Sequence, residues 1–256
     1  MVGVNTMTQT FDAHPRSSLI VALDFDSLST AMKFAKQVSD LVGMFKIGNQ
    51  LFTAAGPQAV REVSALGPGV FLDLKFHDIP NTVAGAVLSA AAMSGVQLMN
   101  VHALGGRAML EAAVQAISAG VPLGEDRPRL LAVTILTSMD QKSMRETGIG
   151  GPPKTRVLKL ARLAKELGVD GVVASVQEAK AIRKACGREF LIVTPGVRPK
   201  EKNGAAKRTD DQARTATPTE AIKAGADYIV VGRPILTAED PRAAAQAIVD
   251  EIAAAK

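Results

Sequence analysis

Aromatic residues are scarce in this sequence. Its 256 residues include no tryptophan, one tyrosine and eight phenylalanines, so aromatic side chains make up only 4% of the chain. Proteins that bind single-stranded nucleic acid without sequence preference stack the bases on aromatic side chains. The composition therefore argues against that class of protein.

Cysteine and long apolar runs are also missing. Cys186 is the only cysteine, so no internal disulfide can form, which favours a reducing compartment. No apolar run approaches the ~20 residues that a membrane-spanning helix needs. Residues 1–17 lack the basic start and apolar core of a secretory signal. With 47% hydrophobic and 21% charged residues, the chain is neither disordered, collagen-like nor a disulfide scaffold, and we expect a cytoplasmic globular protein.

Positive charge is in modest excess. The chain has 30 lysines and arginines against 25 aspartates and glutamates, a formal charge of +5. This balance fits a nucleic-acid-binding protein, and it fits an enzyme for anionic metabolites equally well. The densest basic cluster runs from Arg198 to Arg214, where Pro199, Asn203 and Gly204 predict a loop rather than a basic helix. A solvated surface loop and a phosphate-binding loop are both open on this observation alone.

Short apolar runs alternate with helical patterns after residues 1–17, which look like a loose N-terminal arm. The expected strands are Ser18–Leu23, Val42–Ile47, Gly69–Leu74, Val96–His102, Leu130–Leu136, Asp170–Ser175, Phe190–Thr194 and Asp227–Val231. The expected helices are Ser27–Ser39, Gly56–Leu66, Thr82–Met93, Arg107–Ala119, Thr155–Leu167, Val176–Ala185, Thr217–Ala224 and Pro241–Ala255. Such alternation predicts parallel strands joined by helices, and eight repeats in about 250 residues are typical of a (β/α)8 TIM barrel. We predict an α/β fold with one barrel domain over residues 18–256. An open doubly wound sheet is the alternative, although no G-x-G-x-x-G follows the first strand.

Polar residues gather where the expected strands end, which is where a barrel places its chemistry. In the segment from Phe71 to Thr82, Asp73 and Lys75 are two residues apart and so share one face of a strand. Opposite charges near a barrel interior must pair, because an isolated buried charge is very costly. Together with Asp78 and Lys46 they form an array of alternating charge. A lysine kept protonated among carboxylates is a good proton donor.

The last expected strand runs into Gly232 and Arg233. The glycine permits close approach of a ligand to the backbone, and the arginine offers a forked cation to an oxyanion. The loops after strands seven and eight are the common phosphate site of barrels. The basic loop follows strand seven, so its position favours phosphate binding.

The segment Asp73-x-Lys75-x-x-Asp78-Ile-Pro-Asn-Thr82 resembles the orotidine 5′-phosphate decarboxylase family. Further motifs occur in that family's order and span nearly the whole chain after residue 17. They are Leu23-Asp24, Phe45-Lys46-Ile-Gly48, Asn100-Val-His-Ala103, Leu136-Thr-Ser-Met139, Thr194-Pro-Gly-Val-Arg-Pro199, Asp211-Gln212 and Gly232-Arg-Pro234. The spacing of Asp73, Lys75 and Asp78 alone is shared with related sugar-phosphate barrels.

The resemblance implies a lyase that converts orotidine 5′-monophosphate to uridine 5′-monophosphate and CO2 in pyrimidine biosynthesis, without metal or organic cofactor. It implies that Lys75 protonates C6 of the pyrimidine, that Asp73 lies beside the departing carboxylate, and that the enzyme is a homodimer. Asp78 and Thr82 would reach into the neighbouring subunit's site. The other implied substrate-binding residues are Asp24 and Lys46 at the ribose, Thr137 at the pyrimidine edge, Pro195, and Arg198, Gln212, Gly232 and Arg233 around the phosphate.

Two other functions stay open on the sequence. A metal-dependent sugar-phosphate decarboxylase or aldolase would use Asp73 and Asp78 as magnesium ligands. A basic nucleic-acid-binding protein would use residues 198–214. We expect His77 and Cys186 to be structural, and His102 either to line the mouth of the barrel or to be structural.

Overall fold

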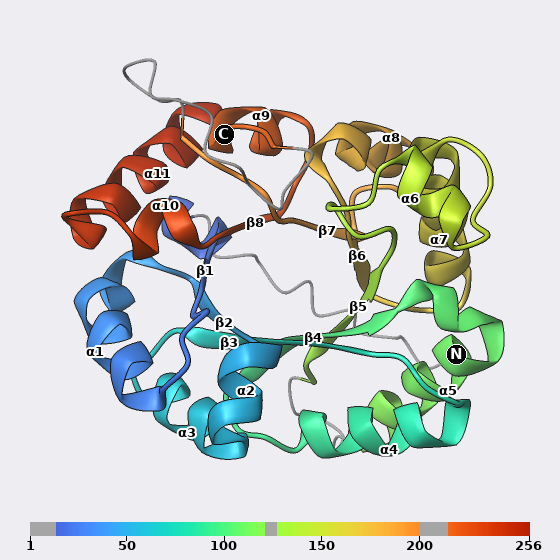
Figure 1. Cartoon of the computed structure of the whole chain (residues 1–256), viewed down its shortest axis with the longest axis horizontal. Helices are drawn as coiled ribbons and strands as arrows, with labels where there is room; N and C mark the ends of the chain where they lie inside the picture. The colour runs from blue at the N-terminus through green and yellow to red at the C-terminus, as the bar shows by residue number, and fades with distance from the viewer. Residues whose placement is uncertain (1–13, 121–126, 200–214) are drawn as a thin grey trace, which may run out of the picture.

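Eight parallel strands close into a single barrel in chain order, and helices surround it (Figure 1). The computed structural model describes residues 14–120, 127–199 and 215–256. The strands are β1 (Leu19–Ala22), β2 (Met44–Gly48), β3 (Gly69–Phe76), β4 (Val96–His102), β5 (Arg129–Val133), β6 (Gly171–Val173), β7 (Leu191–Thr194) and β8 (Tyr228–Val231). The α helices are α1 (Leu28–Val38), α2 (Asn49–Ala55), α3 (Pro57–Ser64), α4 (Pro80–Ala91), α5 (Gly106–Ala119), α6 (Gln141–Glu146), α7 (Pro153–Glu166), α8 (Val176–Cys186), α9 (Pro218–Lys223), α10 (Arg233–Leu236) and α11 (Pro241–Ala255). The predicted (β/α)8 barrel is confirmed.

Period-two alternation along the strands divides the core into two layers. In β1, Leu19 and Val21 face the surrounding helices, whereas Ile20 and Ala22 belong to the cluster that fills the barrel. Buried apolar side chains from seven strands fill the barrel interior, and the partly buried Val173 of β6 packs against them. The buried members are Ile20, Ala22, Met44, Phe71, Leu98, Leu131, Leu191, Val193 and Val230.

Local sequence signals start several of the helices. The Ser27 hydroxyl accepts a hydrogen bond from Thr30 N at the start of α1, as expected for an N-cap. Thr217 and Glu220 form a reciprocal capping box ahead of α9, with Pro218 in its first turn.

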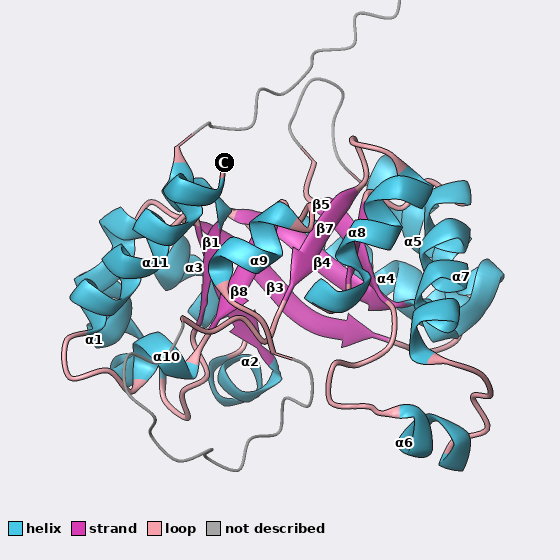
Figure 2. Cartoon of the chain, turned by 90° about the horizontal axis from the view of Figure 1, so that it is seen from above, coloured by secondary structure: helices cyan, strands magenta, loops and turns pink. Residues whose placement is uncertain are grey.

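Three short helices were not predicted: α2, α6 and α10. Each follows the carboxyl end of a strand, and Figure 2 shows all three toward the same end of the barrel. They have seven, six and four residues, too few for a 3.6-residue periodicity to be visible in a sequence. They add structure around the end of the barrel where the site lies.

One strand boundary was wrong for a physical reason. The strand expected to run to Leu136 ends at Val133, after which Thr134 donates both its N–H and its hydroxyl to the Val173 carbonyl. Ile135 is buried in the hydrophobic core and Leu136 is partly exposed, and both line the cavity described below without continuing the strand.

The expected boundary between arm and barrel at residue 17 falls inside a 3-10 helix, η1 (Pro15–Ser18), which packs against α11. Residues 1–13 of the expected arm lie outside the described residues. Within the part of the chain that the structure describes, no helix combines the length and apolar character needed to cross a membrane.

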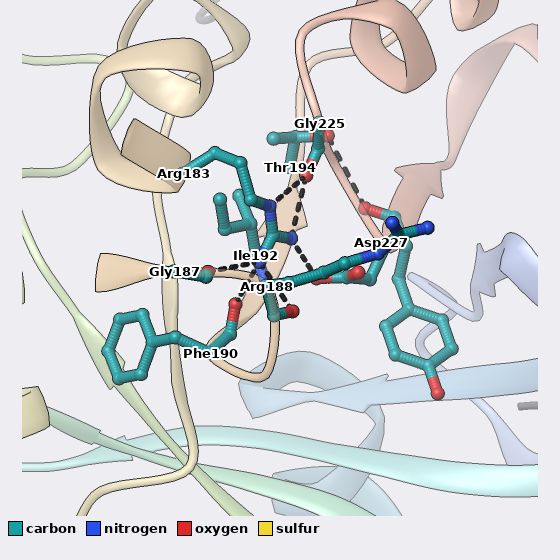
Figure 3. Close-up of polar contacts among 9 residues, drawn as sticks. Arg183, Gly187, Arg188, Phe190, Ile192, Thr194, Gly225 and Asp227 are labelled. Carbon is teal, nitrogen blue, oxygen red and sulfur yellow. Dashed lines mark hydrogen bonds and ion pairs between the residues drawn. The ribbon is translucent and has the colours of Figure 1, made fainter. Parts of the chain in front are cut away.

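The amino ends of β7 and β8 are tied together by one guanidinium group (Figure 3). Arg183 of α8 donates to Asp227 Oδ2 at 2.7 Å, and the same oxygen accepts from Ile192 N at 2.7 Å. Arg183 also donates to the backbone carbonyls of Gly187, Arg188, Phe190 and Gly225. Asp227 directly precedes β8, so this network lies at the end of the barrel opposite the strand ends that carry the site.

Candidate active site

The site is the outermost layer of the barrel interior. On three of the first four strands, and directly after the first one, a residue that fills the barrel is followed two positions later by a polar residue, which therefore points into the same interior. The four pairs are Ala22 and Asp24, Met44 and Lys46, Phe71 and Asp73, and Leu98 and Asn100. The strand period itself places these polar groups together at the carboxyl ends of the strands.

Four of the charged groups form a continuous chain of ion pairs. Lys46 Nζ lies 3.1 Å from Asp24 Oδ1 and 3.4 Å from Asp73 Oδ2. Lys75 Nζ lies 2.7 Å from Asp73 Oδ1. The predicted pairing of Asp73 with Lys75 and the predicted inclusion of Lys46 are thus present in the structure.

Burial and charge oppose each other at the centre of this array. Burial alone would raise the pKa of Asp73, but the Lys46 and Lys75 ammonium groups and two hydrogen bonds outweigh it and hold that pKa below 3.8. Burial likewise opposes the charge on Lys46, and Asp73 and Asp24 together raise its pKa above 10.5. Asp73 and Lys46 are therefore both ionised at neutral pH.

Asn100 is a site residue to which no role was assigned from the sequence. It is fully buried on β4, and its Nδ2 donates to Asp73 Oδ1 at 2.7 Å. The available signal was its spacing, because a polar residue two positions after Leu98 in an otherwise apolar strand must face the barrel interior.

A cavity of about 320 Å³ opens above this layer. Ile135 and Leu136 provide apolar wall on one side, and Arg198 and Arg233 provide cationic wall on another. The volume lies in the ordinary range of small-molecule sites, and the mixture of apolar wall with a few convergent polar groups is typical of them.

Nine of the twelve predicted site residues line this cavity. They are Asp24, Lys46, Asp73, Lys75, Thr137, Pro195, Arg198, Gly232 and Arg233. Asp78 and Thr82 are exposed and do not line the cavity of their own chain. The Asp78 side chain accepts a hydrogen bond from Ile79 N at 2.6 Å. Gln212 lies outside the described residues.

The two histidines near the array stack on each other rather than line the cavity. The rings of His77 and His102 have centroids 5.1 Å apart and planes inclined by 20°. His102 Nδ1 accepts a hydrogen bond from Leu104 N. Burial, followed by the electrostatic effects of His77 and Lys75, lowers the pKa of His102 to about 4. Cys186 is buried, as expected of a structural residue.

The donor set does not favour magnesium between Asp73 and Asp78. Oδ1 of Asp73 already accepts from Lys75 and Asn100, and Oδ2 faces the Lys46 ammonium. Asp78 is not part of this cavity. The described residues contain no group of three or more histidine, cysteine, aspartate or glutamate side chains arranged to hold a metal ion.

A closed (β/α)8 barrel with lysines and carboxylates converging in a cavity at the strand ends defines an enzyme of the TIM-barrel class. Within that class, the chain belongs to the orotidine 5′-phosphate decarboxylase / HUMPS family, whose sequence model matches residues 17–248.

Individual relatives agree with this assignment. The chain is 54% identical over 239 residues to orotidine 5′-phosphate decarboxylase of Geotalea daltonii, covering 93% of this chain and 97% of that protein. It is 55% identical over 239 residues to the enzyme of the same name from Trichlorobacter lovleyi, covering 93% and 96%. Among solved structures, orotidine 5′-phosphate decarboxylase of Lactobacillus acidophilus matches with a TM-score of 0.79 and 40% identity over 91% of this chain and 98% of that one. The Pyrococcus horikoshii enzyme matches with a TM-score of 0.70 and 26% identity over 92% and 99%.

Proposed function

We propose that this chain decarboxylates orotidine 5′-monophosphate to uridine 5′-monophosphate and CO2, as a cytoplasmic enzyme of pyrimidine biosynthesis. The observation that carries the proposal is the placement of the Lys75 ammonium, 2.7 Å from Asp73 and at the wall of the cavity. The names of the relatives and the family membership support the same substrate.

Lys75 supplies the proton in this proposal. When the bond from C6 to the carboxylate carbon breaks, CO2 leaves and the electron pair stays on C6. The Lys75 ammonium stabilises that developing charge and then transfers a proton to C6, leaving a neutral amine. Asp73 and Lys46 keep the region around Lys75 charged and ordered before substrate binds, so little reorganisation is needed during the reaction.

The rest of the cavity fits the other parts of the nucleotide. Asp24 and Lys46 are paired at one wall and are assigned to the ribose hydroxyls. Arg198 and Arg233 follow β7 and β8 and are assigned to the phosphate, where Gly232 leaves the backbone uncovered. Thr137 and Pro195, which also line the cavity, are assigned to the pyrimidine and its surroundings, and Gln212 remains a predicted phosphate contact.

The enzyme acts as a homodimer in this proposal, with Asp78 and Thr82 entering the partner's site. The support is the surface that carries them. Helix α4, which contains Thr82, has no charged residue, and Ile79 and Leu88 are 66% and 45% exposed. An uncharged face with exposed large apolar side chains is typical of a protein interface. In a dimer with two-fold symmetry, the same face of each subunit would form the interface.

The decisive test is loss of orotidine 5′-phosphate absorbance with excess EDTA present. Turnover by the wild-type chain that survives exhaustive chelation supports the proposal, and turnover that requires a divalent metal supports the sugar-phosphate type of mechanism instead. Lys75→Ala should abolish turnover, whereas Lys180→Ala, an exposed lysine on α8, should leave it intact. Near-normal turnover by Lys75→Ala would exclude the proton-donor role.

Sharing of sites between subunits has its own test. Lys75→Ala and Asp78→Ala proteins are each expected to be inactive, but co-refolding them in equal amounts should restore activity. Half of the resulting dimers are mixed, and each mixed dimer has one intact site, so about a quarter of the wild-type activity is expected. Absence of recovery in confirmed mixed dimers would rule out shared sites.

A further inference from the structure

The pairing of β3 with β4 is irregular where the active-site lysine lies. Leu72 pairs with Met99, and the next matched pair is Phe76 with Val101. Three residues of β3, Asp73 to Lys75, therefore lie opposite one residue of β4, which is Asn100. Such bulges re-aim side chains and leave part of the backbone ladder without its regular partner.

The backbone of Lys75 has an unusual conformation within this bulge. Its φ is +51°, and among the described residues no other non-glycine residue has a positive φ. The left-handed region is unfavourable for a residue with a Cβ atom and persists only where its surroundings hold it. The contact that holds it here is a side chain, because Lys75 N donates to Asn100 Oδ1 at 2.7 Å.

The other end of the Asn100 amide holds the carboxylate. Asn100 Nδ2 donates to Asp73 Oδ1 at 2.7 Å, and that same oxygen accepts from Lys75 Nζ at 2.7 Å. A backbone N–H can only donate and an ionised carboxylate can only accept. The amide therefore satisfies both partners in a single orientation, and that orientation fixes the backbone of Lys75 and the carboxylate of Asp73 relative to each other.

We infer that Asn100 is a positioning residue for proton delivery: it clamps Lys75 in its left-handed conformation and Asp73 in its rotamer, so that the Lys75 ammonium is aimed into the cavity. The inference deepens the proposed function and rests on it. A purely structural role is a poor explanation, because other positions that fill the barrel, such as Leu98 and Leu131, are apolar. Burying an amide at this layer costs free energy unless its polar atoms form hydrogen bonds, as those of Asn100 do with Lys75 and Asp73.

Two variants separate the two hydrogen bonds, and a third is the control. Asn100→Leu has a similar volume and loses both bonds. Asn100→Asp keeps an oxygen for Lys75 N but replaces the donor to Asp73 with a second carboxylate. Thr134→Val is the matched control. Thr134 is also fully buried and directly follows β5, the strand next to β4. Among the described contacts, it forms hydrogen bonds only to the Val173 carbonyl.

The primary measurement is the single-turnover rate with saturating enzyme, alongside KM and the thermal midpoint. Both Asn100 variants should slow the chemical step by roughly 10- to 100-fold, the loss expected for a hydrogen bond to a charged group. KM should change less than threefold, and Thr134→Val should keep the wild-type rate at a similar loss of thermal stability. A wild-type chain that does not turn over orotidine 5′-phosphate would refute the proposed function instead, so the two failures are distinguishable.

The pH profile of the same rate is a second readout that a structural role would not move. Asn100 is one of the groups that hold the pKa of Asp73 low, with Lys46 and Lys75. Other titratable or charged groups near the array are Asp24, the stacked His77 and His102, and Arg198 and Arg233 in the cavity wall. The acid limb of the profile should therefore move to higher pH in Asn100→Leu, and further in Asn100→Asp, where two carboxylates compete.

Unchanged rate and unchanged acid limb in either folded variant would overturn the inference. So would a rate loss matched by Thr134→Val. If Asn100→Leu does not fold, the single-turnover rate and the acid limb of Asn100→Asp alone test the inference.

Discussion

Replacing Asp73 by asparagine tests the charge array most directly, because Asp73 is its central member. The change is nearly isosteric, but it removes the negative charge between Lys46 and Lys75 and leaves two ammonium groups facing an amide. The side chains of Asp73 and Lys46 are 11% and 12% exposed, and that of Lys75 is 32% exposed. The Lys46 pair is thus the better shielded of the two.

The magnitude follows from this burial. Removing one partner of a buried ion pair costs about 3–5 kcal/mol, and solvent screening reduces the share due to Lys75. We expect Asp73→Asn to lower the free energy of unfolding by about 2–4 kcal/mol at pH 7. For a domain of this size that is a fall of roughly 5–15 °C in Tm. Turnover should be lost as well, because Lys75 loses the carboxylate that orients it.

The assay is thermal unfolding at fixed protein concentration, followed by circular dichroism, with Asp24→Asn as control. Asp24 contacts the same Lys46, but its side chain is 49% exposed, so its loss should cost less than about 1 kcal/mol.

The contribution of Asp73 to the free energy of unfolding should also change with pH in one direction. The folded-state pKa of Asp73 lies below 3.8, so its contribution is fully present above that pH and disappears as the pH falls further. The difference between wild type and Asp73→Asn should therefore shrink below pH 3.8. Equal stability of the two proteins at pH 7 would refute the reasoning. So would a difference in their free energies of unfolding that grows as the pH falls.

Three further outcomes are expected. Arg233→Ala should raise KM for orotidine 5′-phosphate roughly 10- to 100-fold through loss of a charged contact, as measured by initial rates, and an unchanged KM would contradict a phosphate contact. Gly48→Ala would bring a Cβ atom to 2.9 Å from Lys46 Nζ, so kcat should fall while Tm stays close to wild type; retained kcat would show that Lys46 can move without consequence. Arg183→Met should lower the free energy of unfolding by about 3 kcal/mol in a denaturant titration, because the part-buried carbonyls of Phe190 and Gly225 and the Asp227 carboxylate lose their donor. It should leave kcat/KM of the folded enzyme unchanged, and impaired catalysis would argue that the two ends of the barrel are coupled.

The barrel could be predicted because its determinants are local and repeated. Apolar runs of strand length, separated by helical patterns with recognisable starts such as Ser27 and Thr217, occur eight times. The position of Lys46 at the site follows from the same periodicity. By contrast, α10 has four residues and no pattern, and its formation depends on the barrel that precedes it.

The geometry around Lys75 could not be predicted from its own segment. Two-residue spacing correctly implied contact between Asp73 and Lys75, but the segment is not a regular strand there, since Lys75 has a positive φ and β3 bulges against β4. The cause lies on another strand, in Asn100, and no pattern within β3 reports it. Asp78 and Thr82 do not line the cavity of their own chain, so the role expected of them in a partner subunit's site stays a prediction.

The pairing of β1 with β8 has a consequence for synthesis of the enzyme. Ile20 is matched with Val230, so the ring cannot close until nearly the whole chain has left the ribosome. Until then, a nascent chain that has formed seven strands has two open sheet edges, which are prone to pair with other chains. The cavity also needs Asp24 from just after the first strand and Arg233 from just after the last. Closure of the ring and completion of the cavity are therefore one event, and a nascent chain that ends before β8 would have no complete site.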